Sequence, residues 1–291
     1  MAGTTKFSYA LRGFFVIAAV LLCCGLAFAQ ATAPSTPAQA PKPAEQPAAA
    51  EQLTPYQKSQ LERAFDDWAN LAKYRDADKA LPAPAPDEVR VVFMGDSITE
   101  GWGMKATATS PGRGEFFPGK PYINRGISGQ TTPQMLVRFR QDVIDLHPKV
   151  VIILAGTNDI AGNTGPMRLE DIEANYASMA ELARAHDIKV IYSSMLPVHN
   201  YTPRSQDLFA QRSPEKILEL NRWLKSYCST SSNDKSNACL YLDYFSAMVD
   251  DKGYLRKELA DDGLHPNPAG YKIMAPLAQS AIEKVLGPPK P

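Results

Sequence analysis

Short apolar runs and longer amphipathic stretches alternate along most of the chain. The apolar runs lie at 89–94, 122–124, 149–155, 189–195 and 239–244. The amphipathic stretches, which repeat with the period of a helix, lie at 132–146, 168–186, 214–228 and 268–286. Continuous apolar strands separated by helices are typical of a parallel sheet that helices cover on both faces. The pattern therefore predicts an α/β fold with five parallel strands.

A further helical pattern precedes the first apolar run. Apolar and aromatic residues recur there at roughly helical spacing, at Tyr56, Leu61, Phe65, Trp68, Leu71 and Tyr74. The segment LPAPAPDE at 81–88 then ends the pattern, because proline does not continue a helix. We expect a helix that packs on the domain, and a helix that binds a partner fits the same pattern.

The start of the chain has the pattern of an export signal. Lys6 and Arg12 precede an apolar run at 14–28, which ends in the small-residue segment 27–29. This pattern predicts a signal peptide over 1–29, cleaved after Ala29. An uncleaved anchor is the alternative, although the run is short for a membrane span. An Ala/Pro-rich segment at 30–50 reads as an extended linker, which leaves 51–291 as one domain.

Charge and cysteine content narrow the possibilities further. The 31 basic and 31 acidic side chains cancel, which argues against a nucleic-acid partner. After cleavage the cysteines left are Cys228 and Cys239, in a polar stretch without a nearby histidine or third cysteine that would favour a metal site. A periplasmic or secreted location is oxidising, so we expect these two to form a structural disulfide. We expect no stable membrane insertion of the cleaved protein.

The first apolar run ends on Gly95-Asp96-Ser97, which raises the question of what the serine does. In open parallel sheets, ligands bind beyond the carboxyl ends of the strands. Ser97 would therefore stand at the expected cleft. A serine acts as a nucleophile only when a base, usually histidine, takes its proton and a third group orients that base.

The chain has four histidines, and their places in the pattern separate them. His147 and His186 come just before predicted strands, which puts them at the opposite end of the sheet. His199 follows the fourth strand and could face the cleft. His265 follows the fifth strand, with Asp262 three residues earlier. That spacing can bring a carboxylate to the ring Nδ1–H, which makes His265 the best candidate for the base.

Acyl transfer also needs donors for the negative charge that develops on the carbonyl oxygen. Gly126, after the second strand, could offer a backbone N–H. Asn158, after the third strand, could offer its side-chain amide. Glycine and asparagine also suit turns, so each position alone is weak evidence. Their joint placement with Ser97 and His265 at successive strand ends favours a catalytic site.

Four motifs together resemble the SGNH (GDSL-type) hydrolase superfamily over about 89–286. They are GDS with Ser97, NRGISG with Gly126, GTND with Asn158, and DGLHPNPAGY with Asp262 and His265. The resemblance is nearest to bacterial acylhydrolases related to platelet-activating-factor acetylhydrolase and lysophospholipase L1.

The resemblance implies a three-layer α/β/α sandwich of the flavodoxin type. It also implies a triad of Ser97 as nucleophile, His265 as general base and Asp262 as its orienter. The oxyanion hole would consist of the Ser97 N–H, the Gly126 N–H and the Asn158 amide. Members of the superfamily cleave esters or thioesters of lipids, sugars or small acyl groups without a metal, so no cofactor is expected.

The resemblance leaves the substrate open between acylated sugars and acylated lipids. His199 and Tyr201 lie in a loop expected at the cleft and are candidate substrate-binding residues. The absence of a long apolar lid in the sequence favours short acyl groups. An acyltransferase that moves an acetyl group to a polysaccharide uses the same triad and stays open as an alternative. A binuclear metallophosphoesterase and a non-catalytic binding module fit less well.

Overall fold

A computed structural model describes residues 61–62, 65–108, 112–203, 207–231 and 239–287. These residues belong to one compact unit, within 53–291. The predicted signal peptide and linker, and Tyr56, lie outside the described residues. Among the described residues, no helix is both long and apolar enough to span a bilayer.

Five parallel strands form one sheet in the order β2-β1-β3-β4-β5. Their bounds are β1 Val91–Gly95, β2 Tyr122–Gly126, β3 Val150–Leu154, β4 Lys189–Ser193 and β5 Cys239–Leu242. Each lies at a predicted apolar run, so the predicted sheet is confirmed. The chain reverses direction across the sheet between β1 and β3, and the loops after these strands diverge there. This is the place where open α/β sheets bind ligands.

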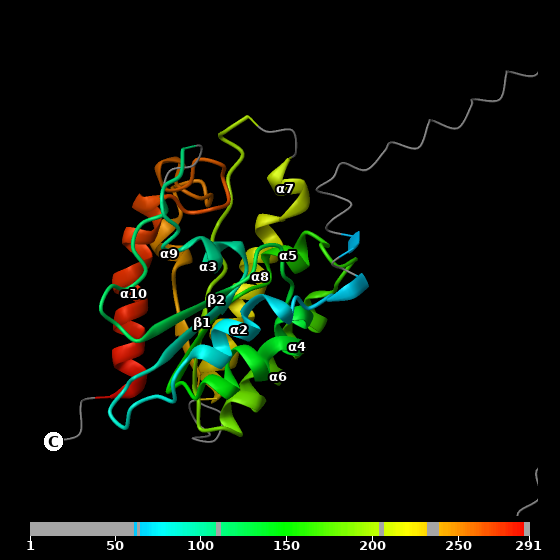
Figure 1. Cartoon of the computed structure of the whole chain (residues 1–291). Helices are drawn as coiled ribbons and strands as arrows, with labels where there is room; N and C mark the ends of the chain where they lie inside the picture. The colour runs from blue at the N-terminus through cyan, green and yellow to red at the C-terminus, as the bar shows by residue number, and fades with distance from the viewer. Residues whose placement is uncertain (1–60, 63–64, 109–111, 204–206, 232–238, 288–291) are drawn as a thin grey trace, which may run out of the picture. The chain divides into compact units, whose positions relative to one another are not determined.

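Helices connect the strands and cover the sheet (Figure 1). The long ones are α4 Thr132–Asp142, α6 Leu169–Arg184, α8 Pro214–Ser231 and α10 Pro268–Leu286. The short ones are α3 Ser97–Gly101, α5 Thr157–Ile160, α7 Leu208–Gln211 and α9 Phe245–Met248, with 3-10 turns η1 Ile144–Leu146 and η2 Lys257–Leu259. The four long helices confirm the predicted amphipathic stretches. The stretch 132–146 divides because α4 ends at Asp142 and η1 follows.

The two faces of the sheet have separate apolar cores. Along β1, Val92 and Met94 join the core formed with α4, α6 and α8, whereas Val91 and Phe93 join the core formed with α10. Figure 1 shows α10 on the opposite side of the sheet from α4 and α6. Because both faces of β1 are buried, its sequence is continuously apolar rather than alternating.

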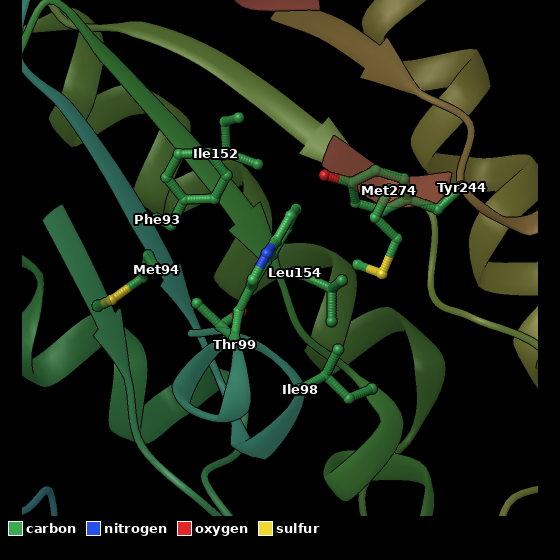
Figure 2. Close-up of a pocket in the computed structure, with 9 residues that line it drawn as sticks. Phe93, Met94, Ile98, Thr99, Ile152, Leu154, Tyr244 and Met274 are labelled. Atoms are coloured by element: carbon green, nitrogen blue, oxygen red, sulfur yellow. The ribbon is translucent and has the colours of Figure 1, made fainter. Parts of the chain in front are cut away.

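The core on the α10 face contains an aromatic cluster and a very small cavity. Phe116 and Phe117 pack around Phe93 and Trp102, with ring centroids 5.0–5.8 Å apart. The cavity beneath α3 has a volume of about 10 Å³. Figure 2 shows apolar side chains of β1, β3, α3 and α10 converging on it. This space is at the lower limit for one water molecule.

The helix predicted before β1 is divided in the structure. Residues 61–62 and 65–66 are helical, but Asn70 takes a left-handed conformation with φ of 56° and interrupts the helix. A new helix, α2, then runs over Ala72–Ala80. The Asp67 carboxylate accepts hydrogen bonds from the N–H groups of Leu71 and Ala72, at 2.7 and 2.8 Å, and so satisfies its first turn. As expected, α2 packs on the domain, against α4.

The predicted disulfide is present. Cys228 in α8 is bonded to Cys239, the first residue of β5, and their Cα atoms are 4.9 Å apart. The bond ties the end of a covering helix to the edge strand of the sheet. Its role in the fold is structural, as the sequence led us to expect.

Candidate active site

Helix α3 places Ser97 directly beyond the carboxyl end of β1. Gly95, the last residue of the strand, has no room for a side chain, since a Cβ there would overlap Thr99 Oγ1 and lie 2.8 Å from Leu154 O. The chain can therefore turn closely into α3. Asp96 caps the helix, because its Oδ1 accepts a hydrogen bond from Ile98 N at 2.9 Å. Ser97 is the first helical residue, and its side chain lies at the edge of a large cavity.

Ser97, His265 and Asp262 form a chain of hydrogen bonds. Ser97 Oγ is 2.9 Å from His265 Nε2, and His265 Nδ1 is 2.7 Å from Asp262 Oδ2. The other carboxylate oxygen of Asp262 accepts bonds from the N–H groups of Leu264 and His265, at 2.9 and 2.8 Å. The turn that joins them depends on Gly263, whose φ is +82°. The structure thus brings together all three residues that the sequence analysis selected as a triad.

The electrostatics of this chain favour an ionised carboxylate beside the imidazole. Burial alone would raise the pKa of Asp262, but the hydrogen bonds from the His265 ring and from backbone N–H groups outweigh it. They hold the pKa of Asp262 well below its usual range. A charged carboxylate at Nδ1 keeps a proton on that nitrogen and leaves Nε2 able to accept one from Ser97.

Asn158, in α5 after β3, also lines the cavity. Its Nδ2 donates to Gln130 O at 3.0 Å, and its Oδ1 accepts from Arg212 at 3.2 Å. These two bonds fix the orientation of the Asn158 side-chain amide. An amide nitrogen carries two hydrogens. The second N–H of Asn158 has no hydrogen-bond partner among the described residues, so it is available to a ligand.

Gly126 does not offer its N–H to the cavity, contrary to the sequence-based expectation. That N–H is donated to Asn124 Oδ1 at 2.9 Å, and Gly126 is not among the residues that line the cavity. Helix α3 packs directly on Gly126, since a Cβ there would overlap Glu100 N and lie 2.6 Å from Glu100 Cα. The glycine is thus required by the packing of α3 on β2.

Gly129, the second glycine of the NRGISG motif, takes the place expected for Gly126. It lines the cavity together with Ser97 and Asn158, and its φ is +79°. Within the described part of the chain, its N–H has no hydrogen-bond partner. The sequence pattern did not single out Gly129, because the candidate glycine was sought directly after the predicted second strand, where Gly126 lies. The signal that could have found it is a second glycine three residues later, in a turn.

The cavity is open, with a volume of about 560 Å³, and most of the side chains around it are polar or charged. Its charged lining residues are Glu100, Arg113 and Arg212. The neutral polar ones are Ser97, Ser128, Asn158, Asn163 and His265. Met104 and Leu264 are the apolar side chains among the residues that line it. Side chains that can form hydrogen bonds are therefore the majority around the cavity, while apolar atoms make up more of its exposed wall.

The structure does not bring His199 and Tyr201 into this cavity. His199 is buried, and its Nε2 lies 3.0 Å from Ala260 O while its Nδ1 accepts from Tyr201 N at 3.1 Å. The Tyr201 hydroxyl donates to Asp250 at 2.6 Å. Neither residue is among those that line the cavity. Both hold the long loop after β4 in place.

Two further buried carboxyls are sequence neighbours of residues that line the cavity, since Asp96 precedes Ser97 and Asp159 follows Asn158. Burial raises the pKa of Asp96 to about 6. Burial also raises the pKa of Asp159, whose carboxylate accepts hydrogen bonds from Thr132 at the start of α4. Among the residues that the structure describes, no cluster of three or more His, Cys, Asp or Glu side chains could hold a metal ion.

Comparison with known proteins identifies the family. Residues 93–273 match the GDSL-like lipase/acylhydrolase family. The chain belongs to the GDSL-like lipase/acylhydrolase family. It is an enzyme of the esterase/acylhydrolase class, and its five-stranded parallel sheet with flanking helices is the fold of its structural neighbours.

Individual relatives of this GDSL hydrolase agree with that assignment. A solved structure from Bacteroides fragilis is 44% identical, with a TM-score of 0.66, and covers 76% of this chain and 99% of that one. A GDSL-like lipase from Bacteroides thetaiotaomicron is 41% identical, with a TM-score of 0.64, and covers 75% and 99%. An acetylxylan esterase from Xylanibacter ruminicola is 27% identical over 230 residues. That match includes 70% of this chain but spans only 45% of the relative's length.

Proposed function

We propose that this GDSL hydrolase is an exported serine esterase that removes short acyl groups, acetyl above all, from carbohydrates. The observation that carries the proposal is the 2.9 Å contact between Ser97 Oγ and His265 Nε2 at an open cavity. A hydroxyl paired with an imidazole, which is in turn paired with a carboxylate, is the arrangement that activates serine for attack on an ester.

The reaction would proceed through an acyl-enzyme. Ser97 Oγ attacks the ester carbonyl carbon while His265 Nε2 takes the hydroxyl proton. The tetrahedral intermediate then collapses, and the C–O bond to the alcohol breaks as His265 returns that proton to the leaving oxygen. A water molecule, deprotonated by His265, attacks the acyl-enzyme in the same way and releases the carboxylic acid. Asp262 orients the imidazole and stabilises its charged form in both halves.

The negative oxygen of each tetrahedral intermediate needs donors. We assign this role to the N–H groups of Ser97 and Gly129 and to the Asn158 amide. All three residues line the cavity, and the Gly126 N–H is engaged with Asn124. Donors held in place before the reaction stabilise the transition state without the cost of reorganisation.

The hydrogen-bonding side chains around the cavity support a carbohydrate rather than a lipid substrate. Sugars present hydroxyls that amide, hydroxyl and guanidinium groups can bind, whereas a long acyl chain needs apolar walls. The cavity beneath α3, at about 10 Å³, is too small to receive such a chain. The acetylxylan esterase among the relatives supports the same substrate class.

The proposed location outside the cytoplasm rests on two features. The first residues have the pattern of a signal peptide, with Lys6 and Arg12 before an apolar run. The Cys228–Cys239 disulfide adds support, because such bonds persist in oxidising compartments.

A substrate panel tests the proposal. Acetylated xylo-oligosaccharides, lysophospholipids and acyl thioesters are compared with nitrophenyl esters of increasing chain length, and Ser97→Ala is the control. We expect the highest kcat/KM on acetylated sugars and on short esters, and a loss of at least ~10⁴-fold in kcat for Ser97→Ala. A maximum at eight carbons or longer would contradict the proposed substrate. Acetyl transfer to an added sugar in preference to water would identify an acyltransferase instead.

A further inference from the structure

The segment Trp68–Asp78 precedes the region that matches the family, yet it contacts the loop that carries Gly129. This segment, which we call the N-terminal strap, includes most of α2, and Figure 1 shows α2 beside α4. Three glutamine side chains, from the loop before α4 and from α4 itself, donate to backbone oxygens of the strap. Gln130 donates to Ala69 O at 2.7 Å, Gln134 to Trp68 O at 2.6 Å and Gln141 to Leu71 O at 2.8 Å.

One contact of the strap reaches the residue before Gly129. Lys73 forms an ion pair with one carboxylate oxygen of Glu100, and the other oxygen accepts from Ser128 N at 2.7 Å and from Ser128 Oγ. Burial alone would raise the pKa of Glu100, but the bonds from Lys73 and Ser128 hold that pKa below its usual value. Glu100 therefore stays ionised as a bridge between the strap and the loop.

A second contact reaches the residue after Gly129. The Gln130 side chain is held between Ala69 O in the strap and the buried guanidinium of Arg138, which also donates to Gly95 O at 3.0 Å. The backbone oxygen of Gln130 accepts from Asn158. A single residue is thus linked to the strap, to the end of β1 and to the amide that faces the cavity.

A third contact fixes the start of the loop. The Tyr74 hydroxyl donates to Gly126 O at 2.5 Å, and the Arg125 guanidinium lies 4.6 Å from the centre of the Tyr74 ring. Asp78 accepts a hydrogen bond from Arg125 Nε at 2.9 Å. Burial raises the pKa of Tyr74 to about 12, so the hydroxyl keeps its proton and remains a donor.

We propose that the N-terminal strap is a positioning element for the oxyanion hole. Both neighbours of Gly129 are anchored to it, Ser128 through Glu100 and Lys73, and Gln130 through Ala69. The Gly129 N–H belongs to the peptide unit shared with Ser128, so its direction depends on how that neighbour is held. Gly129 is left-handed and has no side chain of its own, and the Asn163 amide binds its carbonyl oxygen, at 2.9 Å, rather than its N–H. This inference rests on the proposed function, in which that N–H stabilises the tetrahedral intermediate.

Lys73→Met tests the strap, and Lys79→Met is the matched control. Lys73 is exposed, and the change removes its charge without opening the core. Lys79 lies on the same helix and has no ion pair among the described residues. For Lys73→Met we expect kcat on nitrophenyl acetate to fall about tenfold, with KM changed less than about twofold. Lys79→Met should match the natural chain, and Lys73→Arg should restore most of kcat.

A transition-state mimic separates positioning from a merely structural role. Phenylboronic acid forms a tetrahedral adduct with the serine oxygen, so its Kd should weaken by about the same factor as kcat in Lys73→Met. A double variant with Ser128→Ala should lose less than the product of the two single losses, since both act through Glu100.

Two results would overturn the strap proposal. One is unchanged kcat and unchanged boronate affinity in Lys73→Met while Ser97→Ala is inactive. The other is fully multiplicative losses in the double variant. A Ser97→Ala protein that stays active would instead overturn the proposed function.

Discussion

The two sides of helix α3 border two very different cavities. Ser97, Glu100 and Gly101 face the open cavity of about 560 Å³. Ile98, Thr99 and Trp102 line the cavity of about 10 Å³ in the core. Positions three and four apart share a face of a helix, so a single turn presents a reactive surface on one side and a packed one on the other.

This difference explains how the site can be both exposed and rigid. The side facing the cavity carries hydrogen-bonding groups that can bind a polar ester. The opposite side is fixed by the apolar core of β1, β3 and α10, which leaves α3 little freedom to shift. The packed core on the other side of α3 also leaves no room for an acyl chain to extend past Ser97. Changes on the two sides of α3 should therefore affect different quantities.

The largest effect below is expected on the cavity side, for Asn158→Ala. The change removes one proposed donor to the oxyanion, and kcat on a short ester should fall by ~10²–10³, equivalent to ~3–4 kcal/mol. Stopped-flow and steady-state kinetics measure this loss. Asn200→Ala, which removes an exposed amide in the loop after β4 outside the residues that line the cavity, is the control and should keep its kcat. Full activity in Asn158→Ala would remove that residue from the oxyanion hole.

Much of the fold was predictable because burial leaves a simple trace in the sequence. Strands buried on both faces are continuously apolar, as β1 and β3 are, and the less buried edge strands β2 and β5 also lie at predicted short runs. The position of α2 was not predictable in the same way. Asn70 interrupts the helix through its backbone conformation, and Asp67 restarts the helix through capping bonds. Neither effect changes the spacing of apolar residues.

The site shows the same division between pattern and geometry. Asp262 and His265 were identifiable because their contact is local, across three residues of one turn. Gly126 and Gly129 could not be separated, because the choice depends on α3 packing against the end of β2. His199 and His265 both follow strands, but the ring nitrogens of His199 are taken up by the Ala260 carbonyl and the Tyr201 N–H. Only tertiary structure reveals which nitrogen faces a serine.

On the core side of α3, a matched pair of methionines separates stability from catalysis. Met274 on α10 is buried and lines the small cavity, whereas Met104 is 54% exposed at the open one. Met274→Ala should lower the free energy of unfolding by about 3 kcal/mol and leave kcat at low temperature nearly unchanged. Met104→Ala should change stability by less than ~0.5 kcal/mol. Urea denaturation measures both, and equal losses would contradict the contrast between the two sides.

Asp96 lies at the start of α3, where the two sides meet, and its titration reports how dry that boundary is. Burial raises the pKa of Asp96 from 3.8 to about 6 in the folded protein. Between these pH values the folded protein holds a proton that the unfolded chain has released, so this group makes the fold less stable as pH rises. Asp96→Asn keeps the oxygen that caps α3 and removes the titration.

The natural chain should therefore lose stability relative to Asp96→Asn as pH rises. Between about pH 4 and pH 7 the difference in the free energy of unfolding should shift by roughly 2 kcal/mol in favour of the variant. Urea denaturation at a series of pH values measures it. Asp171→Asn is the control, because the pKa of that exposed carboxyl is lowered by a hydrogen bond from Arg168, which gives the opposite sign. A constant difference for Asp96→Asn across this range would mean that water reaches the Asp96 carboxyl. The dry packing on the core side of α3 would then not extend to its first turn.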